Sequence, residues 1–379
     1  MLSPSLTQKY RINPELLAAV GGIEIKDKLI TGEEMLIPIP TRTYTVRHSD
    51  TLGSIATRFG IRREALLGAN PQLMGCDGVY DGQVLTLRYE NMGLGMAAAV
   101  GYLSPSCKKE KLISALPYLT YVAFCYGGYN GRTVNIQGGF EQNVKAVKDS
   151  GKIPLLRVFD RTGGDFLNDK NTHERLCCEL VEISQRYGFS GVIFASYQAA
   201  KNMSEAYADF IVKIRRQMIG CELIFLCEFD EGAKSVCCEL SDGGILVPGG
   251  DGGFNTPTAE QEILSAFAEG GESSKIFVDL PSYATMENQL IPLCEARRLI
   301  LRARSEIEKD PELNLSFAKT KNYSLYFEGI ERTKAKLTEI GELGYMGVSF
   351  DIENAPVWQM MLFYNMFTPV GFSTVCPCG

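Results

Sequence analysis

The chain contains 379 residues, 45% of them hydrophobic, and has a formal net charge of −7 at pH 7. A sequence of this length and hydrophobic content can fill the core of one large domain and of one or two small ones, which excludes a disordered protein. Lys and Arg are spread along the chain without a basic stripe that could neutralise a row of phosphates, so we exclude nucleic acid as a partner.

The N-terminal region has no recognisable targeting signal. Residues 1–10 lack the charged start and apolar run that mark a secretory signal. The apolar stretch at residues 96–100 is far shorter than the ~20 residues of a membrane helix, so no membrane span is predicted. We therefore expect the protein to be made and kept on the cytosolic side, or to be exposed only when a surrounding cell lyses.

The first part of the chain is an internal repeat. Residues 5–20 align with residues 54–69 without a gap. Each copy predicts two short helices joined by a turn, then a glycine-containing turn and a strand, at residues 31–38 in the first copy and 81–87 in the second. Only the second copy has an opening strand, at residues 44–47.

The second copy has motifs that are specific to one family of small modules. Tyr-x-Val at residues 44–46 is followed by Ser-Asp-Thr-Leu at 49–52, Asn-Pro at 70–71 and Asp-Gly-Gln-Val-Leu at 81–85. With these motifs, residues 43–88 resemble a LysM domain. The resemblance implies a βααβ fold that binds N-acetylglucosamine units of peptidoglycan or chitin in a shallow groove.

The resemblance also implies which residues line that groove. Its two walls are a loop of Asp50, Thr51, Leu52 and Gly53 and a segment of Asn70, Pro71, Gln72 and Leu73. Backbone groups in two such loops can hydrogen-bond N-acetyl groups while aliphatic side chains cover their methyls. Two of these residues also have an ordinary structural interpretation, with Asp50 as a helix N-cap and Asn70 as a helix C-cap.

The first copy, residues 1–40, departs from the family pattern because it lacks the opening strand and the Asp-Thr-Leu loop. Half of its groove is therefore missing. Either the start of the chain cuts off a larger repeat, or this copy is only a packing partner for the second. Residues 89–95 are expected to form a linker.

A large domain is predicted over residues 96–372. It contains eight short apolar runs, at residues 97–102, 119–125, 153–159, 191–195, 222–227, 244–247, 275–280 and 347–350. Eight such strands with helices between them predict an α/β fold, a (β/α)8 TIM barrel. Helices are expected at residues 205–218, with Ser204 as the N-cap, and at residues 256–267.

Several segments of this domain, taken in order, resemble the catalytic domain of family 18 glycoside hydrolases. They are residues 100–102, 116–122, 187–192, 344–350 and 356–358. With LysM repeats in front, the chain resembles more narrowly the spore-cortex and spore-germination branch of that family in endospore-forming bacteria. The resemblance implies peptidoglycan as a partner, spore coat proteins as further partners, and a location in the coat or cortex of the spore envelope.

The catalytic carboxylates of that family are missing from the matching positions. The family's fourth strand carries Asp-Gly-x-x-x-Asp-x-Glu, in which the Glu protonates the glycosidic oxygen and the second Asp holds the substrate's acetamido group. The matching segment begins at Ser190 and has Ala195 at the position of the assisting Asp and Tyr197 at the position of the proton donor. A tyrosine with its ordinary pKa of about 10 is a poor acid at neutral pH, so we expect an inactive barrel.

Two further family positions also differ. The sixth strand carries Met-x-Tyr-Asp in the family, whereas residues 246–250 read Leu-Val-Pro-Gly-Gly. The eighth strand ends in a Trp in the family and in Asp351 here. The only Trp of the chain, Trp358, follows Pro356 and is interpreted as core packing.

Relocated carboxylates could restore hydrolysis. The acidic residues expected at strand ends are Asp160, Glu228, Asp230, Asp279, Asp351 and Glu353. Barrels usually carry their chemistry at this end, and Glu228, Asp230 and Asp351 are the substitutes we select. The alternative is that these side chains cap helices or pair with Arg157 or Arg161.

Most of the 12 cysteines are expected to be buried thiols. Cys125, Cys221 and Cys227 lie in apolar runs, and adjacent pairs occur at residues 177–178 and 237–238. The tail, residues 373–379, holds Cys376 and Cys378, which could cross-link chains or capture a metal, or could belong to a disordered end. No cofactor and no metal site is predicted.

Three hypotheses about function follow. In the preferred one, a LysM-anchored barrel of the spore envelope binds peptidoglycan or another coat component without cleaving it. The rival is a spore-cortex peptidoglycan β-N-acetylglucosaminidase that uses relocated carboxylates. The third is a scaffold that is cross-linked through the cysteines of the tail.

Overall fold

The computed structural model describes residues 9–10, 12–74, 78–90, 93–202, 205–233, 236–248, 257–270, 273–287 and 289–369. Several sequence predictions lie outside these residues: the N-cap at Ser204, residues 249–250, the start of the helix at residue 256, and the tail with Cys376 and Cys378.

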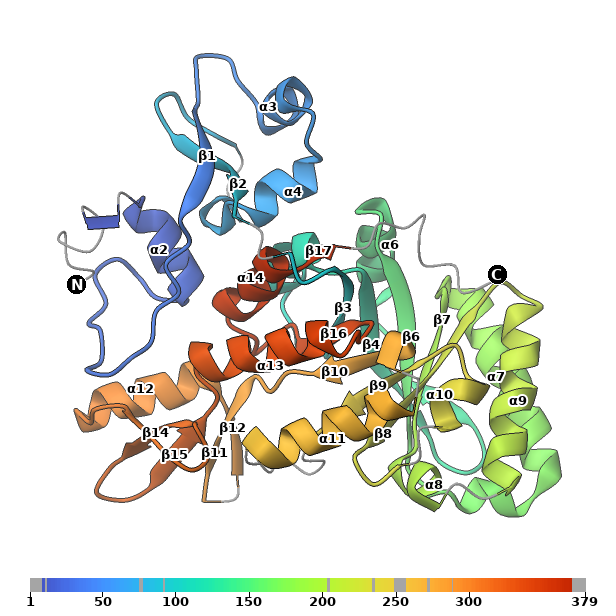
Figure 1. The fold of residues 1–379 in the computed structure, drawn as a ribbon. Helices are drawn as coiled ribbons and strands as arrows, with labels where there is room; N and C mark the ends of the chain where they lie inside the picture. Colours follow the sequence, from blue (N-terminus) through green and yellow to red (C-terminus); the bar gives the residue numbers. More distant parts are fainter. Residues whose placement is uncertain are drawn as a thin grey trace.

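The second repeat copy folds as the predicted βααβ module (Figure 1). Strands β1 (Pro40–Thr45) and β2 (Val84–Tyr89) pair antiparallel. Between them lie helices α3 (Leu52–Phe59) and α4 (Arg63–Gly68) and the short 3-10 helix η1 (Pro71–Leu73).

Local capping and a small core hold this module together. Helix α3 begins with a capping box, in which the side chains of Thr51 and Ser54 each accept a hydrogen bond from the other's backbone N–H. Ile55, Leu66 and Leu85 are fully buried where the helices meet the strands. Burial of a side chain of this size contributes about 1.5–3 kcal/mol, which a module this small needs.

The first copy does not form such a module. Its helix α2 (Pro14–Gly21) begins at Asn13 and packs against η1 of the second copy and against helix α14 (Val357–Met366) of the large domain. No strand forms among residues 23–39, so the strand predicted at residues 31–38 is wrong. A strand needs a hydrogen-bonding partner, and the described part of this copy contains no opening strand to provide one.

The large domain is the predicted TIM barrel. Its strands are β3 (Met96–Leu103), β4 (Tyr121–Tyr129), β6 (Ile153–Asp160), β7 (Gly191–Ala195), β8 (Ile224–Asp230), β9 (Gly244–Val247), β10 (Ile276–Asp279) and β16 (Gly347–Asp351). Neighbouring strands pair in parallel, and β3 closes the barrel by pairing with both β4 and β16.

Helices surround the barrel, as Figure 1 shows. In chain order they are α5 (Lys109–Ala115), η2 (Leu116–Tyr118), α6 (Glu141–Asp149), η3 (Asp165–Asn168), α7 (Lys170–Tyr187), α8 (Tyr197–Asn202), α9 (Glu205–Ile219), α10 (Val236–Leu240), α11 (Pro257–Glu269), η4 (Ser273–Lys275), α13 (Ile330–Glu342) and α14. Two short strands extend the sheet: β5 (Val134–Ile136) pairs with β4, and β17 (Thr368–Pro369) pairs with β3.

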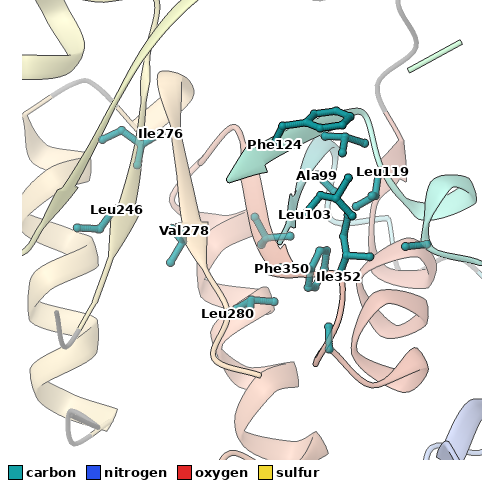
Figure 2. Packing of buried hydrophobic residues seen from close by; sticks show 14 of the residues in the cluster. Ala99, Leu103, Leu119, Phe124, Leu246, Ile276, Val278, Leu280, Phe350 and Ile352 are labelled. Carbon is teal, nitrogen blue, oxygen red and sulfur yellow. The ribbon is translucent and has the colours of Figure 1, made fainter. Parts of the chain in front are cut away.

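Side chains along the barrel strands alternate between the interior and the helices. In β3, Ala98 and Val100 belong to the cluster inside the barrel, whereas Ala99 and Leu103 belong to the larger cluster beneath the helices. Figure 2 shows part of that larger cluster, including Ala99, Leu103 and Phe350. The interior is therefore packed, and a ligand can enter only at its ends.

A second sheet is inserted between β10 and β16, and the sequence reasoning does not predict it. It is antiparallel and consists of β11 (Tyr283–Met286), β12 (Gln289–Pro292), β13 (Glu308–Lys309), β14 (Ser316–Lys319) and β15 (Ser324–Phe327), with helix α12 (Leu293–Ala303) between β12 and β13. We call residues 283–327 the insertion. Its core contains Ala284, Ile300 and Leu325.

Residues 23–36, which we call the strap, join the first repeat copy to the insertion. Ile30 is buried in the core of the insertion. Gly32 has a φ of 80°, and a Cβ at this position would lie 1.9 Å from the carbonyl oxygen of Ile307. Only glycine fits there, because the backbone of the strap contacts the backbone of the insertion directly.

Ion pairs reinforce this contact. Arg297 pairs with Glu33 at 2.5 Å, and Lys309 pairs with Glu34 at 2.8 Å. Both glutamates belong to the strap, and both basic residues belong to the insertion. What resembles the end of a glycan-binding repeat is therefore a structural part of the large domain.

The cysteine predictions hold at some positions only. Cys177, Cys227 and Cys238 are buried, as predicted. Cys125 and Cys221 are half-buried, and Cys178 is exposed. Successive residues of a helix point about 100° apart, so only one member of an adjacent pair in α7 can face the core.

None of the helices in the described part of the chain is long and apolar enough to cross a membrane.

Candidate functional site

Asp50 braces the loop before helix α3. Its carboxylate accepts hydrogen bonds from the Tyr44 hydroxyl (2.6 Å) and from the backbone N–H of Arg47 (2.9 Å), and it pairs with Arg58 at 2.9 Å. The hydrogen bond from Tyr44, assisted by Arg47 and Arg58, lowers the pKa of Asp50 below its ordinary value. The N-cap of α3 is Thr51, so the interpretation of Asp50 as the N-cap is wrong.

Asn70 is a buried clamp between helix α4 and strand β2. Its amide group donates to the carbonyl oxygens of Leu66 (2.8 Å) and Thr86 (2.7 Å), and its side-chain oxygen accepts from the backbone N–H of Thr86 (2.8 Å). The bond to Leu66 satisfies a carbonyl at the helix end, although the C-cap residue itself is Ala69. Since Asn70 is fully buried, its side chain cannot reach a glycan.

The other predicted groove residues differ in exposure. Leu52, Pro71 and Leu73 are buried. Thr51 and Gly53 are exposed, and Gln72 is half-buried. Among these six predicted groove residues, the ones with surface accessible to a ligand are therefore Thr51, Gly53 and Gln72.

A pocket of about 260 Å³ opens at the C-terminal ends of the barrel strands, and we call it the mouth. Its lining comprises Tyr102, Ser104, Cys125, Arg157, Tyr197, Glu228, Val247, Asp279, Leu280, Ser282, Tyr283 and Asp351. TIM barrels carry their sites at this end, and ligand pockets typically measure ~300–1,000 Å³. The barrel residues named from the sequence divide into two groups. Those that line the mouth are Tyr197, Glu228, Asp279 and Asp351, and those that do not are Asp160, Ser190, Ala195, Asp230 and Glu353.

Glu228, at the end of β8, is saturated with partners. Arg157 of β6 donates from Nε to one carboxylate oxygen and from Nη2 to the other, each at 2.6 Å. The hydroxyl of Tyr102 donates at 3.0 Å, and that of Tyr197 also donates. Burial alone would raise the pKa of Glu228, but the Arg157 charge and these hydrogen bonds bring the pKa below its ordinary value. Glu228 is therefore ionised and has no proton to give.

Tyr197 and Ala195, the residues that the sequence resemblance assigns to the acid and the assisting Asp, have no carboxyl group. Tyr197 opens helix α8, and burial together with the nearby charge of Glu228 raises its pKa well above the ordinary value of 10. Ala195 ends β7 and is fully buried. Neither side chain can protonate a leaving group at neutral pH.

Two of the selected substitutes, Asp230 and Asp351, serve local structure. Asp230 pairs with Lys201 at 2.8 Å. Asp351 accepts hydrogen bonds from the backbone N–H of Glu353 (2.9 Å) and from the side-chain amide of Asn354 (2.7 Å). The alternative interpretation named helix capping or pairing with Arg157 or Arg161. Among the three selected substitutes only Glu228 has such a partner, Arg157, whereas Asp230 pairs with a lysine and Asp351 braces a turn.

Asp160 and Glu353 are occupied in the same way. Asp160 accepts from the backbone N–H groups of Thr162 and Gly164, each at 2.9 Å. Glu353 accepts from the hydroxyl of Ser104 at 2.6 Å. Both carboxylates stabilise loops at the barrel end.

Asp279, at the end of β10, differs from the other mouth carboxylates. The hydroxyl of Ser349, on the neighbouring strand β16, donates to one of its oxygens, and no Lys or Arg among the described residues forms an ion pair with it. Burial raises the pKa of Asp279 to about 7, aided by the charges of Glu228 and Asp351 and opposed by the Ser349 hydrogen bond. The sequence places it at a strand end, but only the fold reveals that none of the described residues forms an ion pair with it.

Trp358 lies away from the mouth. It packs against the main core and lines a second pocket of about 180 Å³, which the strap, the insertion and residues 353–358 enclose. Its role in packing agrees with the sequence interpretation.

Comparison with known proteins identifies the LysM domain and finds the fold of the whole chain in solved structures. Residues 44–88 match the LysM domain family. No sequence match is found among curated proteins. The spore cortex-lytic enzyme SleL of Bacillus megaterium has a similar structure, with 18% identity, a TM-score of 0.74 and coverage of 97% of this chain and 96% of that chain.

Two further structures have the same fold. SleL of Bacillus cereus, a spore cortex-lytic enzyme, is 17% identical with a TM-score of 0.73, over 97% of this chain and 96% of that one. A class V chitinase mutant from Nicotiana tobaccum, in complex with NAG4, is 11% identical with a TM-score of 0.61, over 71% of this chain and 98% of that one. This chain thus combines a LysM domain with a TIM barrel whose fold matches those of spore cortex-lytic enzymes and class V chitinases.

Proposed function

We propose that this protein binds N-acetylglucosamine-containing glycan of the spore envelope, peptidoglycan above all, and that its barrel does not cleave it. The LysM match at residues 44–88 supports the binding role. The similar structures named as spore cortex-lytic enzymes support the spore envelope as the location. The saturated ion pair of Glu228 with Arg157 is the observation that carries the non-catalytic role.

The position of the LysM module favours an anchoring role. The Tyr118 hydroxyl in η2 donates to the carbonyl oxygen of Gly68 in α4 at 2.8 Å, so the module is docked on the barrel. Helix η2 directly precedes β4, which places this contact at the N-terminal end of the strands, opposite the mouth. In Figure 1 the module and the insertion lie on opposite sides of the barrel. A glycan held by the module is therefore not delivered directly to the mouth.

Enlarging Gly53 should block the LysM groove. A Cβ at Gly53 meets only the Thr51 hydroxyl oxygen, at 3.8 Å, so a side chain fits without strain and projects from an exposed position. We expect Gly53→Tyr to weaken retention of the full chain on purified muropeptides at least tenfold, measured by pull-down at increasing glycan concentration.

The matched control is Gly53→Ala, which adds only a methyl group and should bind like the parent. It should also favour helix α3 slightly, by about 0.5–1 kcal/mol. Equal retention of the Tyr and Ala variants would place the glycan elsewhere and contradict the groove assignment. Asn70 is unsuitable for this test because its loss would disturb the module's fold.

A second candidate function, a β-N-acetylglucosaminidase with a relocated acid, is favoured by Asp279. Its carboxyl lines the mouth, and burial raises its pKa to about 7, which is the range that a general acid needs near neutral pH. Hydrolysis would also require a second group to stabilise the developing positive charge. Glu228 is neutralised by Arg157 and is poorly suited to this role.

Incubation with spore-cortex peptidoglycan separates the two candidates. We expect the full chain to release no new reducing ends over the no-protein control, at pH values from 5 to 8. Release that disappears in Asp279→Asn and persists in Asp230→Asn would establish the hydrolase and refute the non-catalytic proposal. Asp230 is a fair control because it also ends a barrel strand, β8, which β9 separates from β10, and it does not line the mouth.

A further inference from the structure

Two carboxyl groups of the mouth have no Lys or Arg as an ion-pair partner among the described residues. Arg157 and Glu228 neutralise each other through a 2.6 Å ion pair. The two other acids of the mouth, Asp279 and Asp351, lie at the ends of the adjacent strands β10 and β16. They accept hydrogen bonds from hydroxyl, amide and backbone N–H groups. These neutral donors orient the carboxyl groups but supply no positive charge, and burial raises the pKa of Asp279 to about 7, so without a cation this group is only partly ionised at neutral pH. The mouth therefore favours a ligand that brings a cation.

The remaining walls suit a sugar ring. Tyr102, Tyr197 and Tyr283 line the mouth together with Val247 and Leu280, so aromatic and aliphatic surface surrounds the two acids. Such surface can cover the C–H face of a pyranose, while the carboxylates accept hydrogen bonds from its polar groups. A pocket of about 260 Å³ with one charged side fits a small ring better than an extended chain.

We propose that the mouth binds a hexosamine unit whose nitrogen is a free ammonium group, with Asp279 as its counter-ion and Asp351 as the second acidic wall. This inference rests on the proposed function, because it takes the mouth to hold a sugar of the same polymer without cleaving it. An N-acetylated unit carries a neutral amide and cannot compensate the carboxylates. An ammonium group can, through charge-assisted hydrogen bonds that are roughly twice as strong as neutral ones.

The protonation state of Asp279 is consistent with this role. Without a ligand, burial and the like charges of Glu228 and Asp351 raise its pKa to about 7, while Ser349 and the more distant Lys336 oppose the rise. A bound ammonium would favour the ionised carboxylate. The positive charge of the ligand would thus balance the negative charge of Asp279 in the mouth.

Calorimetric titration of the full chain with two trimers tests the proposal, one of glucosamine and one of N-acetylglucosamine. The titration is run at about pH 6, where the amino groups of glucosamine are mostly ammonium groups and a bound ammonium can still draw the proton from Asp279. Changing Asp279→Asn should weaken binding of the glucosamine trimer at least tenfold and leave binding of the N-acetylated trimer unchanged, since the latter is assigned to the LysM module. The control Asp230→Asn should change neither affinity. Thermal melting of each variant checks that it is folded.

A second variant separates charge from folding. Ser349→Ala keeps the carboxylate of Asp279 and removes only its neutral partner, so it should retain glucosamine binding within about threefold. Glucosamine binding that is equal in the parent and in Asp279→Asn would overturn the proposal. So would N-acetylated trimer binding that depends on Asp279, or equally tight and Asp279-dependent binding of 1,5-diaminopentane, which would show that no sugar is needed. Failure of the proposed function is a different result, namely no binding of the N-acetylated trimer by the parent protein.

Discussion

Replacing Arg157 by Met should destabilise the protein by about 3–5 kcal/mol, because the change leaves a buried carboxylate without its counter-charge. Glu228 is only 2% exposed and accepts two hydrogen bonds of 2.6 Å from Arg157, one on each carboxylate oxygen. The two tyrosine hydroxyls that also donate to it are neutral and cannot replace the guanidinium. Urea denaturation at pH 7, followed by circular dichroism, measures the change.

The double variant Arg157→Met/Glu228→Gln should recover most of this loss, since it removes both charges together. An exposed pair supplies the comparison: Arg186 and Glu182 on helix α7 are 60% and 66% exposed, and Arg186→Met should cost about 0.5 kcal/mol or less. A single Arg157 variant as stable as the parent would mean that Glu228 is protonated in the folded protein. That result would revive Glu228 as an acid.

Asp279→Asn should stabilise the protein at neutral and alkaline pH and do little near pH 4. The folded-state pKa of about 7 lies above the ordinary value of 3.8, so the folded protein holds a proton that the unfolded chain releases between these values. Stability of the parent therefore falls as pH rises from about 4 to about 7 and then stays level. The full difference is on the order of 4 kcal/mol, because one pKa unit corresponds to about 1.4 kcal/mol.

Melting temperatures of parent and variant at pH 5, 6, 7 and 8 test this prediction. The gap between them should widen with pH up to about 7, since burial and repulsion from Glu228 and Asp351 disfavour the ionised carboxylate and the buried Lys336 compensates only in part. Asp230→Asn, which removes an acid that already has a cation partner, should show no such widening. Parallel curves for Asp279→Asn and the parent would mean that Asp279 titrates normally.

The parts of the fold that are predictable from sequence are those with local signals. The LysM module has turn and cap motifs within 45 residues, and the barrel strands are continuous apolar runs because they are buried on both faces. The insertion lacks such a signal. Its strands have at most four residues, and β12 is exposed or half-buried throughout, so neither a buried run nor a clear alternation appears.

The chemistry of the mouth depends on contacts that no local pattern contains. Glu228 lies 71 residues from Arg157 and 31 residues from Tyr197, and the register of the barrel strands brings the three together. From the sequence, Glu228 looks like a possible acid because its counter-ion is remote in the chain. Asp279 differs from Glu228 because no basic side chain among the described residues forms an ion pair with it, and the sequence alone cannot show this.

The internal repeat leads to one wrong prediction, a strand in the first copy. The alignment of the two copies transfers a strand to residues 31–38, but the strand in the second copy exists because β1 pairs with it. In the first copy the same stretch finds its partners in the insertion, through Glu33 and Glu34. Tertiary contacts override the local pattern there.

The strap also constrains the order in which parts of the chain can fold. Glu33 and Arg297 are 264 residues apart, so the strap can form this contact only after the insertion has been synthesised. The LysM module between them has only local contacts and can fold early. Ile30, by contrast, completes the core of the insertion only near the end. The strap therefore docks later than the LysM module folds, although it precedes that module in the sequence.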